Sequence, residues 1–393
     1  MFAKHIRTMA IDMSTIPLPY DVVFDILSRL PLKPVCRFRC TSKGWRGLMS
    51  SPVFAAAHRS RHGPLLVDTG SFQEEEPDGG RDMRLLDIKG NIVRVIRGAG
   101  GYGMTCNTSL DDLVCVNGAS CGGVNVVDPA TGKVLLSCPQ VEIIEHHSFP
   151  YAYQRFYFTF GFGRAIPSSE YKLVRFVADQ GRSCEIFTLG DGRCWRQTQP
   201  SPVKICHERG SPIVIDGVMY VFQDQRLYND DTLLCFDLES EQWKADVIQG
   251  PLKFVHGENT GTIGIRLTEL NGALCIVQSV FNRLLDPFTN IWILDNKDKR
   301  SWSKAYTITM APSACRYMPL WVMSDGGKLL LHCSFDKGCD KNRNHKGWSL
   351  VLQIYDPLTE TCTDILGTPD DLAGRIGLCS FGFDHSACQK LVN

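Results

Sequence analysis

The sequence predicts a mainly β protein, in which a short three-helix segment precedes a β-propeller of six blades, with seven blades as the alternative. Three observations predict this fold class. Apolar residues recur at helical spacing near the N-terminus, the rest of the chain reads as short strands, and a similar turn recurs six times along it. A chain of 393 residues with 44% apolar and 21% charged residues can bury a large core, which excludes global disorder.

The first predicted helix begins after Pro17 and Pro19, and Asp21 suits its first turn. Apolar residues then recur at helical spacing as far as Pro31, which ends the helix. They are Val22, Val23, Ile26, Leu27 and Leu30. An apolar stripe of this kind indicates either a helical core or a surface for a partner.

Two further short helices are expected before residue 60. The second covers about residues 34–40, because Pro34 suits a first helical turn. The third contains Trp45, Leu48 and Met49 and ends before Pro52. Three short helices make a very small core, so a partner or the following domain is expected to complete it.

The remainder of the chain, from residue 64, repeats one loose unit. An apolar strand leads into a turn of the form Asp-x-x-(Thr/Gly/Ser), and the next strand often begins with Trp. The turns lie near residues 87, 128, 190, 237, 295 and 356, at intervals of about 41 to 62 residues. Asp side chains hydrogen-bond the local backbone in such turns. Short antiparallel sheets repeated at this period predict propeller blades.

Two dipeptides and the C-terminus add detail to this prediction. Asp216-Gly217 and Asn271-Gly272 are typical of two-residue hairpins between neighbouring strands. A strand within 376–383 is expected to complete the ring beside the first strand, 65–67.

Residues 16–54 resemble an F-box, most of all the plant type. The matching motifs are Leu18-Pro19, Asp21, Ile26-Leu27, Leu30-Pro31, Lys33, Arg37-Phe38-Arg39-Cys40, Lys43-x-Trp45 and Phe54. Pro34, Cys36, Thr41 and Ser42 depart from the family's pattern, and the small Cys36 is expected to weaken one contact.

The resemblance implies docking onto the Skp adaptor of a Skp–cullin–F-box ubiquitin ligase. Carried over to this sequence, the adaptor-binding residues would be Leu18, Pro19, Ile26, Leu27, Leu30, Pro31 and Val35, with Lys43 and Trp45 at the edge. The alternative is that these residues form only an internal helical core, above all for Trp45.

Roughly 300 residues of the chain resemble the F-box-associated β-propeller of plant F-box proteins. The motifs that carry this resemblance are Asp128-Pro-x-Thr-Gly132, Phe160-Gly-Phe-Gly163, Tyr171-Lys-Leu-Val-Arg175, Cys184-Glu-Ile-Phe187, Val218-Met-Tyr220 and Ile291-Trp-Ile-Leu-Asp295. The resemblance implies that the propeller holds a substrate while the F-box holds the ligase.

The predicted domains are a leader at 1–15, an F-box at 16–60 and a propeller at 61–393, and their charges differ. The formal net charges are +1, +5 and −6, so the overall charge of zero is a cancellation. A basic helical domain suits an acidic partner. Nucleic acid is not expected, because the basic residues alternate with apolar ones and no aromatic stacking platform accompanies them.

The function predicted from these features is a substrate-recognition subunit that links a protein substrate, through the Skp adaptor, to a cullin. The chain itself is expected to be no enzyme, without catalytic residues, metal or cofactor. The alternative is a propeller enzyme or a carbohydrate-binding propeller with a helical head that does not dock. That alternative predicts carboxylates or a metal cluster at one mouth of the central channel.

Several motifs favour structural interpretations. Gly98-x-Gly-x-x-Gly103 lacks the following helix that dinucleotide binding needs, and His146-His147 lacks a third ligand with metal-site spacing. The 17 cysteines include no CxxC pair and are expected to be reduced core residues. Without an apolar leader or a transmembrane run, the expected location is the cytoplasm, the nucleus or both, and no membrane partner is expected.

Two segments are candidates for substrate contact. The polar, cationic insertion 337–348 contributes Lys341, Arg343, His345 and Trp348, although a long hairpin loop of this kind can also be merely tolerated. In the aromatic segment 148–163, Phe residues alternate from 156 to 162, and this period favours a buried strand face.

Overall fold

A computed structural model describes residues 18–379 of the chain outside a set of gaps. The gaps are 31–33, 36–37, 39–40, 50, 52, 55–56, 59–60, 62–64, 70–81, 101–103, 109–112, 119–122, 130, 139–157, 178–181, 192–193, 207–208, 225–230, 253–261, 283–284, 296–300, 324–325, 337–347 and 368–375. The chain divides into two compact units, Met1–Pro64 with Ser380–Asn393, and Leu65–Cys379. The domain limits predicted from the sequence stay predictions.

The first unit contains helices α1 (Tyr20–Arg29) and α3 (Lys43–Met49), which confirm the first and third predicted helices. Asp21 lies in the first turn of α1, where an acid complements the helix dipole, and the Val23 N–H donates to the Pro19 carbonyl at 3.0 Å. Residues 34, 35 and 38 are helical within the predicted second helix, and residues 53–54, 57–58 and 61 add helical turns that the sequence did not predict.

The second unit contains six four-stranded antiparallel sheets, here called blades 1 to 6. Blade 1 consists of β24 (Ile376–Cys379), β1 (Leu65–Asp68), β2 (Met83–Leu86) and β3 (Ile92–Ile96). Blade 2 consists of β4 (Met104–Thr108), β5 (Val114–Gly118), β6 (Val124–Asp128) and β7 (Lys133–Cys138). Blade 3 consists of β8 (Phe158–Arg164), β9 (Tyr171–Val177), β10 (Ser183–Thr188) and β11 (Arg196–Gln197).

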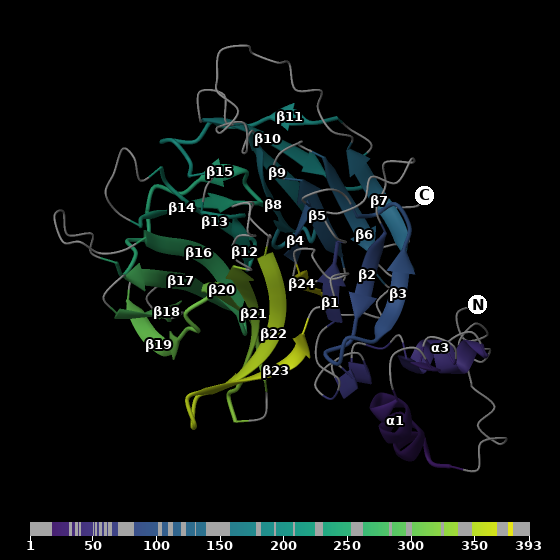
Figure 1. Ribbon diagram of the computed structural model, residues 1–393. Coiled ribbons are helices and arrows are strands. Elements are labelled where there is room, and N and C mark those ends of the chain that lie inside the picture. Colours follow the sequence, from purple (N-terminus) through teal and green to yellow (C-terminus); the bar gives the residue numbers. More distant parts are fainter. Residues whose placement is uncertain are drawn as a thin grey trace, which may run out of the picture. The chain divides into compact units, whose positions relative to one another are not determined.

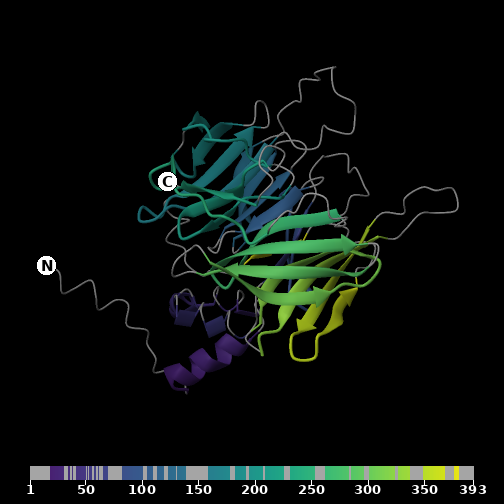
Figure 2. The ribbon, with the colours of Figure 1, turned by 90° about the vertical axis from the view of Figure 1, so that its left-hand side faces the viewer.

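The other three blades follow the same order. Blade 4 consists of β12 (Ile213–Ile215), β13 (Val218–Phe222), β14 (Leu233–Asp237) and β15 (Gln242–Trp243). Blade 5 consists of β16 (Thr262–Leu270), β17 (Ala273–Asn282), β18 (Leu285–Leu294) and β19 (Trp302–Thr309), which lie side by side in Figure 2. Blade 6 consists of β20 (Ala314–Val322), β21 (Leu329–Asp336), β22 (Trp348–Asp356) and β23 (Thr361–Gly367).

The six blades surround a centre and form the predicted propeller (Figure 1). Their innermost strands contact one another in succession from β24 through β4, β8, β12 and β16 to β20. Blade 6 then packs on blade 1 through Leu330 and Leu352 against Leu66 and Leu86. The C-terminal strand β24 pairs with β1 in the register Leu65↔Cys379, which confirms the predicted ring closure.

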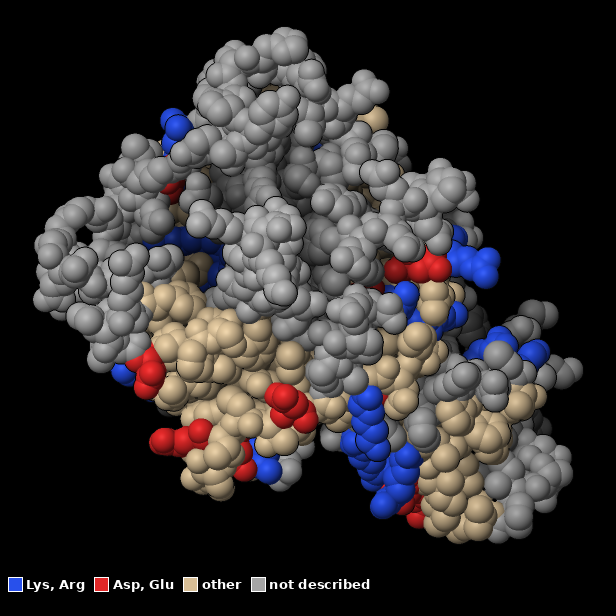
Figure 3. All heavy atoms as spheres, viewed as in Figure 1, with Lys and Arg blue, Asp and Glu red and all other residues tan. Residues whose placement is uncertain are grey.

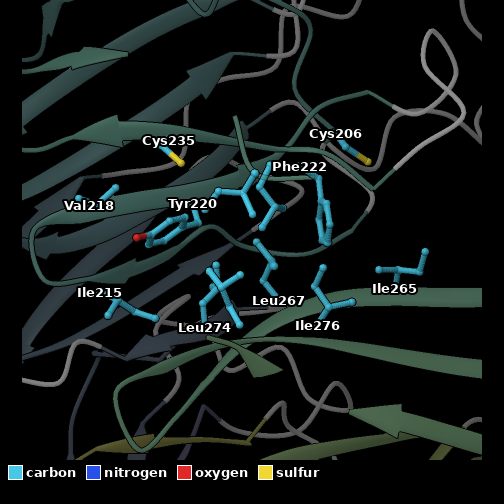
Figure 4. Packing of buried hydrophobic residues seen from close by; sticks show 13 residues of the cluster. Cys206, Ile215, Val218, Tyr220, Phe222, Cys235, Ile265, Leu267, Leu274 and Ile276 are labelled. Carbon is cyan, nitrogen blue, oxygen red and sulfur yellow. The ribbon is translucent and has the colours of Figure 1, made fainter. Parts of the chain in front are cut away.

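The core lies between the faces of neighbouring blades. Figure 4 shows the cluster between blades 4 and 5, where Tyr220 and Phe222 of β13 meet Leu267 of β16 and Ile276 of β17. The predicted burial of the alternating aromatics is confirmed for Phe160 and Phe162 of β8. Phe156 lies outside the described residues. Of the nine cysteines whose side chains the structure describes, six are buried and all nine are free thiols, as expected of core residues.

All six predicted turns fall at the same place, between the third and fourth strands of a blade. The Asp128 carboxylate accepts hydrogen bonds from the N–H and hydroxyl of Thr131 at 3.1 and 2.6 Å. Asp87, Asp237 and Asp356 cap their own turns in the same way. The two predicted hairpins are also confirmed, since Asp216-Gly217 and Asn271-Gly272 all have the positive φ that such turns require.

The alternation of strand direction gives the propeller two unlike ends. The connections between the first and second strands, and between the third and fourth, lie at one end, which we call the tight-turn end. The other connections begin and end at the opposite end, which we call the long-connection end because the chain between neighbouring blades is longest there. The chain enters β1 at Leu65 and leaves β24 at Cys379, and both residues lie at the tight-turn end.

Glu241 joins blades 3 and 4 at the tight-turn end. Its carboxylate accepts a hydrogen bond from Lys172 Nζ at 2.9 Å and two from the Arg196 guanidinium. Burial tends to raise the pKa of Glu241, but the hydrogen bonds and charges of Arg196 and Lys172 outweigh it and hold the pKa below its ordinary value. The Glu241 carbonyl also accepts from the Thr198 hydroxyl at 3.2 Å. One residue therefore links two blades through three side chains.

Candidate functional site

Helix α1 carries apolar side chains on two faces. The inner face packs within the unit: Leu27 is 2% exposed, Val23 is buried, and Phe24 meets Phe54 edge-on with ring centroids 5.4 Å apart. This packing accounts for part of the stripe predicted from the sequence. The other part remains at the surface.

The outer face of α1 includes Val22 and Ile26, and Leu18 lies just before the helix; all three are 40–45% exposed. The spacing of four residues places Val22 and Ile26 in one row along the helix, and Leu18 precedes them by the same interval. Solvent-exposed apolar rows on a small helical unit are typical of surfaces that bind a partner. The sequence prediction included Leu18 and Ile26 in the binding surface and missed Val22, which the same spacing of four would have found.

A polar network fixes the orientation of α1. Asp25 pairs with Arg29 at 2.9 Å and with Arg61 at 2.7 Å, and Arg61 also donates to the buried Ser28 hydroxyl. The hydrogen bond from Arg29 is the largest effect on the pKa of Asp25 and lowers it; burial opposes this, but the hydrogen bond and charge of Arg61 add to the lowering, so the pKa lies below its ordinary value. Since Arg61 lies 36 residues after Asp25, the network ties the end of the unit to its first helix.

His58 and Phe54 close the inner side of the helical unit. The His58 ring stacks on Phe54 with centroids 6.0 Å apart, and its Nε2 lies 3.0 Å from the Leu30 carbonyl oxygen. This carbonyl is at the C-terminal cap of α1, where backbone oxygens lack helical partners. The backbone carbonyl at the end of α1 therefore has a partner in His58, which lies 28 residues after Leu30.

A second apolar contact joins a residue that precedes α3 to a residue within α3. Phe38 is 37% exposed and lies against Trp45 with ring centroids 5.4 Å apart. The Ser42 hydroxyl accepts a hydrogen bond from the Trp45 N–H at 3.1 Å, which is the role of a helix N-cap. Lys43 is exposed beside this cap. Trp45 is therefore partly a packing residue, as the alternative interpretation of the sequence held.

The structure sorts the predicted adaptor-binding residues by exposure. Leu18, Pro19, Ile26 and Lys43 are exposed, Leu30 and Trp45 are half-buried, and Leu27 and Val35 are buried. Pro31 lies outside the described residues. A buried side chain supports the exposed ones and does not itself present a surface, so direct contact is expected mainly from the exposed group. Their role in binding stays a prediction.

Of the four residues predicted to contact the substrate, the structure describes one. Lys341, Arg343 and His345 lie outside the described residues, and Trp348 is the first residue of β22, at the long-connection end. On the face in Figure 3, basic and acidic side chains of the described residues lie interspersed. The glycine motif at 98–103 leads into strand β4, whereas dinucleotide binding needs a helix there.

Over the described part of the chain, no group of three His, Cys, Asp or Glu side chains could hold a metal ion. The same residues include no helix that is long and apolar enough to cross a membrane.

Comparison with known families identifies both units. The F-box domain family matches residues 17–55, and the F-box associated beta propeller domain family matches residues 102–335, which is more than half of the chain.

Several proteins of Arabidopsis thaliana are similar over most of their length. F-box protein At1g11270 is 26% identical over 293 residues, which cover 71% of this chain and 87% of that protein. F-box protein At5g10340 is 25% identical over 357 residues, covering 81% and 76%. F-box protein At3g07870 is 23% identical over 391 residues, covering 89% and 87%.

Proposed function

Because this chain belongs to the family of proteins with an F-box-associated beta propeller domain, here preceded by an F-box, we propose that it is the substrate-recognition subunit of a Skp–cullin–F-box ubiquitin ligase. The F-box binds the Skp adaptor, and through it a cullin, while the propeller binds the protein to be ubiquitinated. The chain acts as a binding subunit, and the transfer chemistry belongs to its partners. It works in the cytoplasm, the nucleus or both.

The observation that carries this proposal is the outer face of α1. Leu18, Val22 and Ile26 form an apolar row that the helical unit leaves at its surface, although the inner face of the same helix is well packed. Burying such side chains against a partner contributes roughly 1.5–3 kcal/mol each when burial is complete. The adaptor supplies the apolar surface that covers this row.

The positive charge of the helical unit also supports the proposed binding of the Skp adaptor. Arg29, Lys43 and Arg46 of the helical unit are exposed, and the segment 16–60 has a formal net charge of +5. A partner with an acidic rim would associate faster with such a surface and would be favoured over basic competitors. Docking thus combines an apolar centre with a cationic periphery.

For the substrate, Lys341, Arg343, His345 and Trp348 remain candidate contacts. In sequence the first three fall between β21 and β22, and Trp348 begins β22 at the long-connection end of blade 6.

The decisive test is co-purification of the full chain with a Skp adaptor. We expect Ile26→Asp to reduce adaptor recovery at least tenfold, because it places a charge in the middle of the apolar row. Ile92→Asp is the matched control, since Ile92 is similarly exposed but lies on strand β3 of the propeller. Position 27 is unsuitable for the test, because a charge at the buried Leu27 would unfold the unit. Equal recovery with Ile26→Asp and wild type, or no recovery with wild type, contradicts the proposal.

A further inference from the structure

At the tight-turn end of the propeller, several acidic side chains form hydrogen bonds or ion pairs within the propeller itself. The carboxylates of Asp87, Asp128, Asp237 and Asp356 cap their own turns. Glu241 is held by two cations of the neighbouring blade. Because these groups hold turns and blades together, they are not themselves available to a partner. A turn capped by Asp also recurs in four of the blades, so it provides little that could distinguish one partner from another.

The covalent connections to the first unit are also at the tight-turn end. Leu65 begins β1 there and Cys379 ends β24 beside it. The long-connection end carries no such connection. Its segments differ in length and composition from blade to blade, and unlike connections on a rigid scaffold are where binding residues are usually found.

Blades 3 and 4 form an ordered corner at the long-connection end. The Arg182 Nε donates to the Ser201 carbonyl at 2.7 Å, and the Ser201 N–H donates back to the Arg182 carbonyl at 2.9 Å. Further along the same segment, the Asp224 N–H donates to the Lys204 carbonyl at 2.8 Å, and residue 205 bridges to Gln223. These hydrogen bonds hold two connections from different blades in one fixed arrangement.

This corner is cationic. The Arg182 and Lys204 side chains are both exposed, and neither forms an ion pair with any residue that the structure describes. Two acids that the structure describes beside the neighbouring strands of blade 4 are not exposed at this corner: Asp224 is buried, and the buried Asp231 accepts the Leu252 N–H at 2.9 Å. Two exposed cations, Arg182 held through its Nε and Lys204 on a hydrogen-bonded backbone, favour an acidic ligand.

Resting on the proposed function, we propose that the protein substrate binds the long-connection end of the propeller, and that the corner formed by Arg182, Ser201 and Lys204 holds an acidic segment of it. The two cations pair with carboxylates of the substrate. Substrate and ligase then occupy different surfaces of the chain, one built by the propeller and the other by the helical unit.

The test compares the full chain, bound to the Skp adaptor, with charge-reversal variants. Substrates are first defined as proteins that accumulate in cells when Ile26→Asp replaces the wild type. We expect Lys204→Glu to lower the recovery of these proteins about tenfold and Arg182→Glu to act in the same direction, because opposite charges at the contact become like charges. Adaptor recovery should stay unchanged. Lys89→Glu is the control, because Lys89 is an exposed cation at the tight-turn end.

A second measurement uses salt. Recovery of the accumulating proteins by the wild type should fall between 50 and 300 mM salt, and recovery by Lys204→Glu should change little, because added ions screen a contact that the variant lacks. Unchanged recovery with Lys204→Glu, or equal loss with Lys89→Glu, overturns the inference. Failure of the wild type to retain the adaptor would instead overturn the proposed function.

Discussion

Removing the carboxylate at position 241 tests the account of how blades 3 and 4 are joined. In Glu241→Ala, Lys172 keeps its hydrogen bond to the Leu238 carbonyl at 2.8 Å and a 3.7 Å contact with Glu170. The ammonium group loses its nearest counter-charge while its side chain remains only 5% exposed. Arg196 loses the same partner but is 41% exposed, so water replaces the contact.

The magnitude follows from this difference in burial. Removing one partner of a buried ion pair costs about 3–5 kcal/mol, because the other charge is left uncompensated in a medium of low polarity. Glu241 is 17% exposed and Glu170 remains near Lys172, so we expect Glu241→Ala to lower the free energy of unfolding by about 2–3 kcal/mol. Arg196→Ala should cost about 0–1 kcal/mol, as is usual for an exposed pair.

Urea unfolding of the full chain measures both variants. Intrinsic fluorescence follows the unfolding transition, and Trp243, two residues from Glu241 in sequence, is one of the seven tryptophans that contribute to it. Replacing both partners, in Glu241→Leu with Lys172→Met, should recover most of the lost stability, since no charge remains buried. The reasoning is refuted if Glu241→Ala changes the free energy of unfolding by less than about 0.5 kcal/mol, or if Arg196→Ala costs as much.

Three further predictions concern the propeller. Because the folded pKa of Glu241 is lowered, its stabilisation is present above its unfolded pKa of about 4.3 and is lost as the pH falls below that value, so Glu241→Gln should unfold with a weaker acid dependence. Gly161→Ala should cost about 1–3 kcal/mol, since the added methyl group would overlap a methionine side chain of blade 4. Deleting 376–393 removes β24 and its pairing with β1, which should lower the stability by about 2–4 kcal/mol.

Each of these predictions has a matched control. Wild-type and Glu241→Gln proteins with identical stability curves between pH 3 and 6 would contradict the pH argument. Gly264→Ala lies on another inner strand with its nearest neighbour 3.9 Å away, so it should be nearly neutral, and equal losses at both glycines would refute the packing argument. Deleting only 380–393 spares β24 and should leave the urea midpoint unchanged; a midpoint that falls equally in both deletions would exclude ring closure as the cause.

Local physics made the blade count predictable. Four of the six turns are specified within a few residues, because an Asp side chain caps the same turn in which it lies, as at Asp128 and Asp237. The two Gly hairpins are equally local, since positive φ belongs to the residues themselves. Each of these signals can be recognised from a few neighbouring residues, without knowing which distant residues pack against them. Their repetition along the chain then predicted a series of blades.

The apolar stripe in the sequence did not predict which side chains of α1 are buried within the helical unit and which are exposed. Val22 and Val23 are neighbours of equal hydrophobicity, yet one is exposed and the other is buried. The inner face packs against residues far along the chain, such as Phe54, which contacts Phe24 and lies 30 residues after it. Long-range partners of this kind leave no periodic signal. Glu241 is a second example, because its partner Lys172 lies 69 residues away.

The two ends of the propeller respond differently to substitution, and this difference bears on how substrate choice can change. Replacing Asp237 removes the acceptor for the N–H groups of Glu239 and Ser240, so the turn and its blade lose stability. Replacing Lys204 breaks no ion pair with a described residue and leaves its backbone hydrogen bond intact. Mutations at the long-connection end can therefore alter partner affinity at little cost in folding.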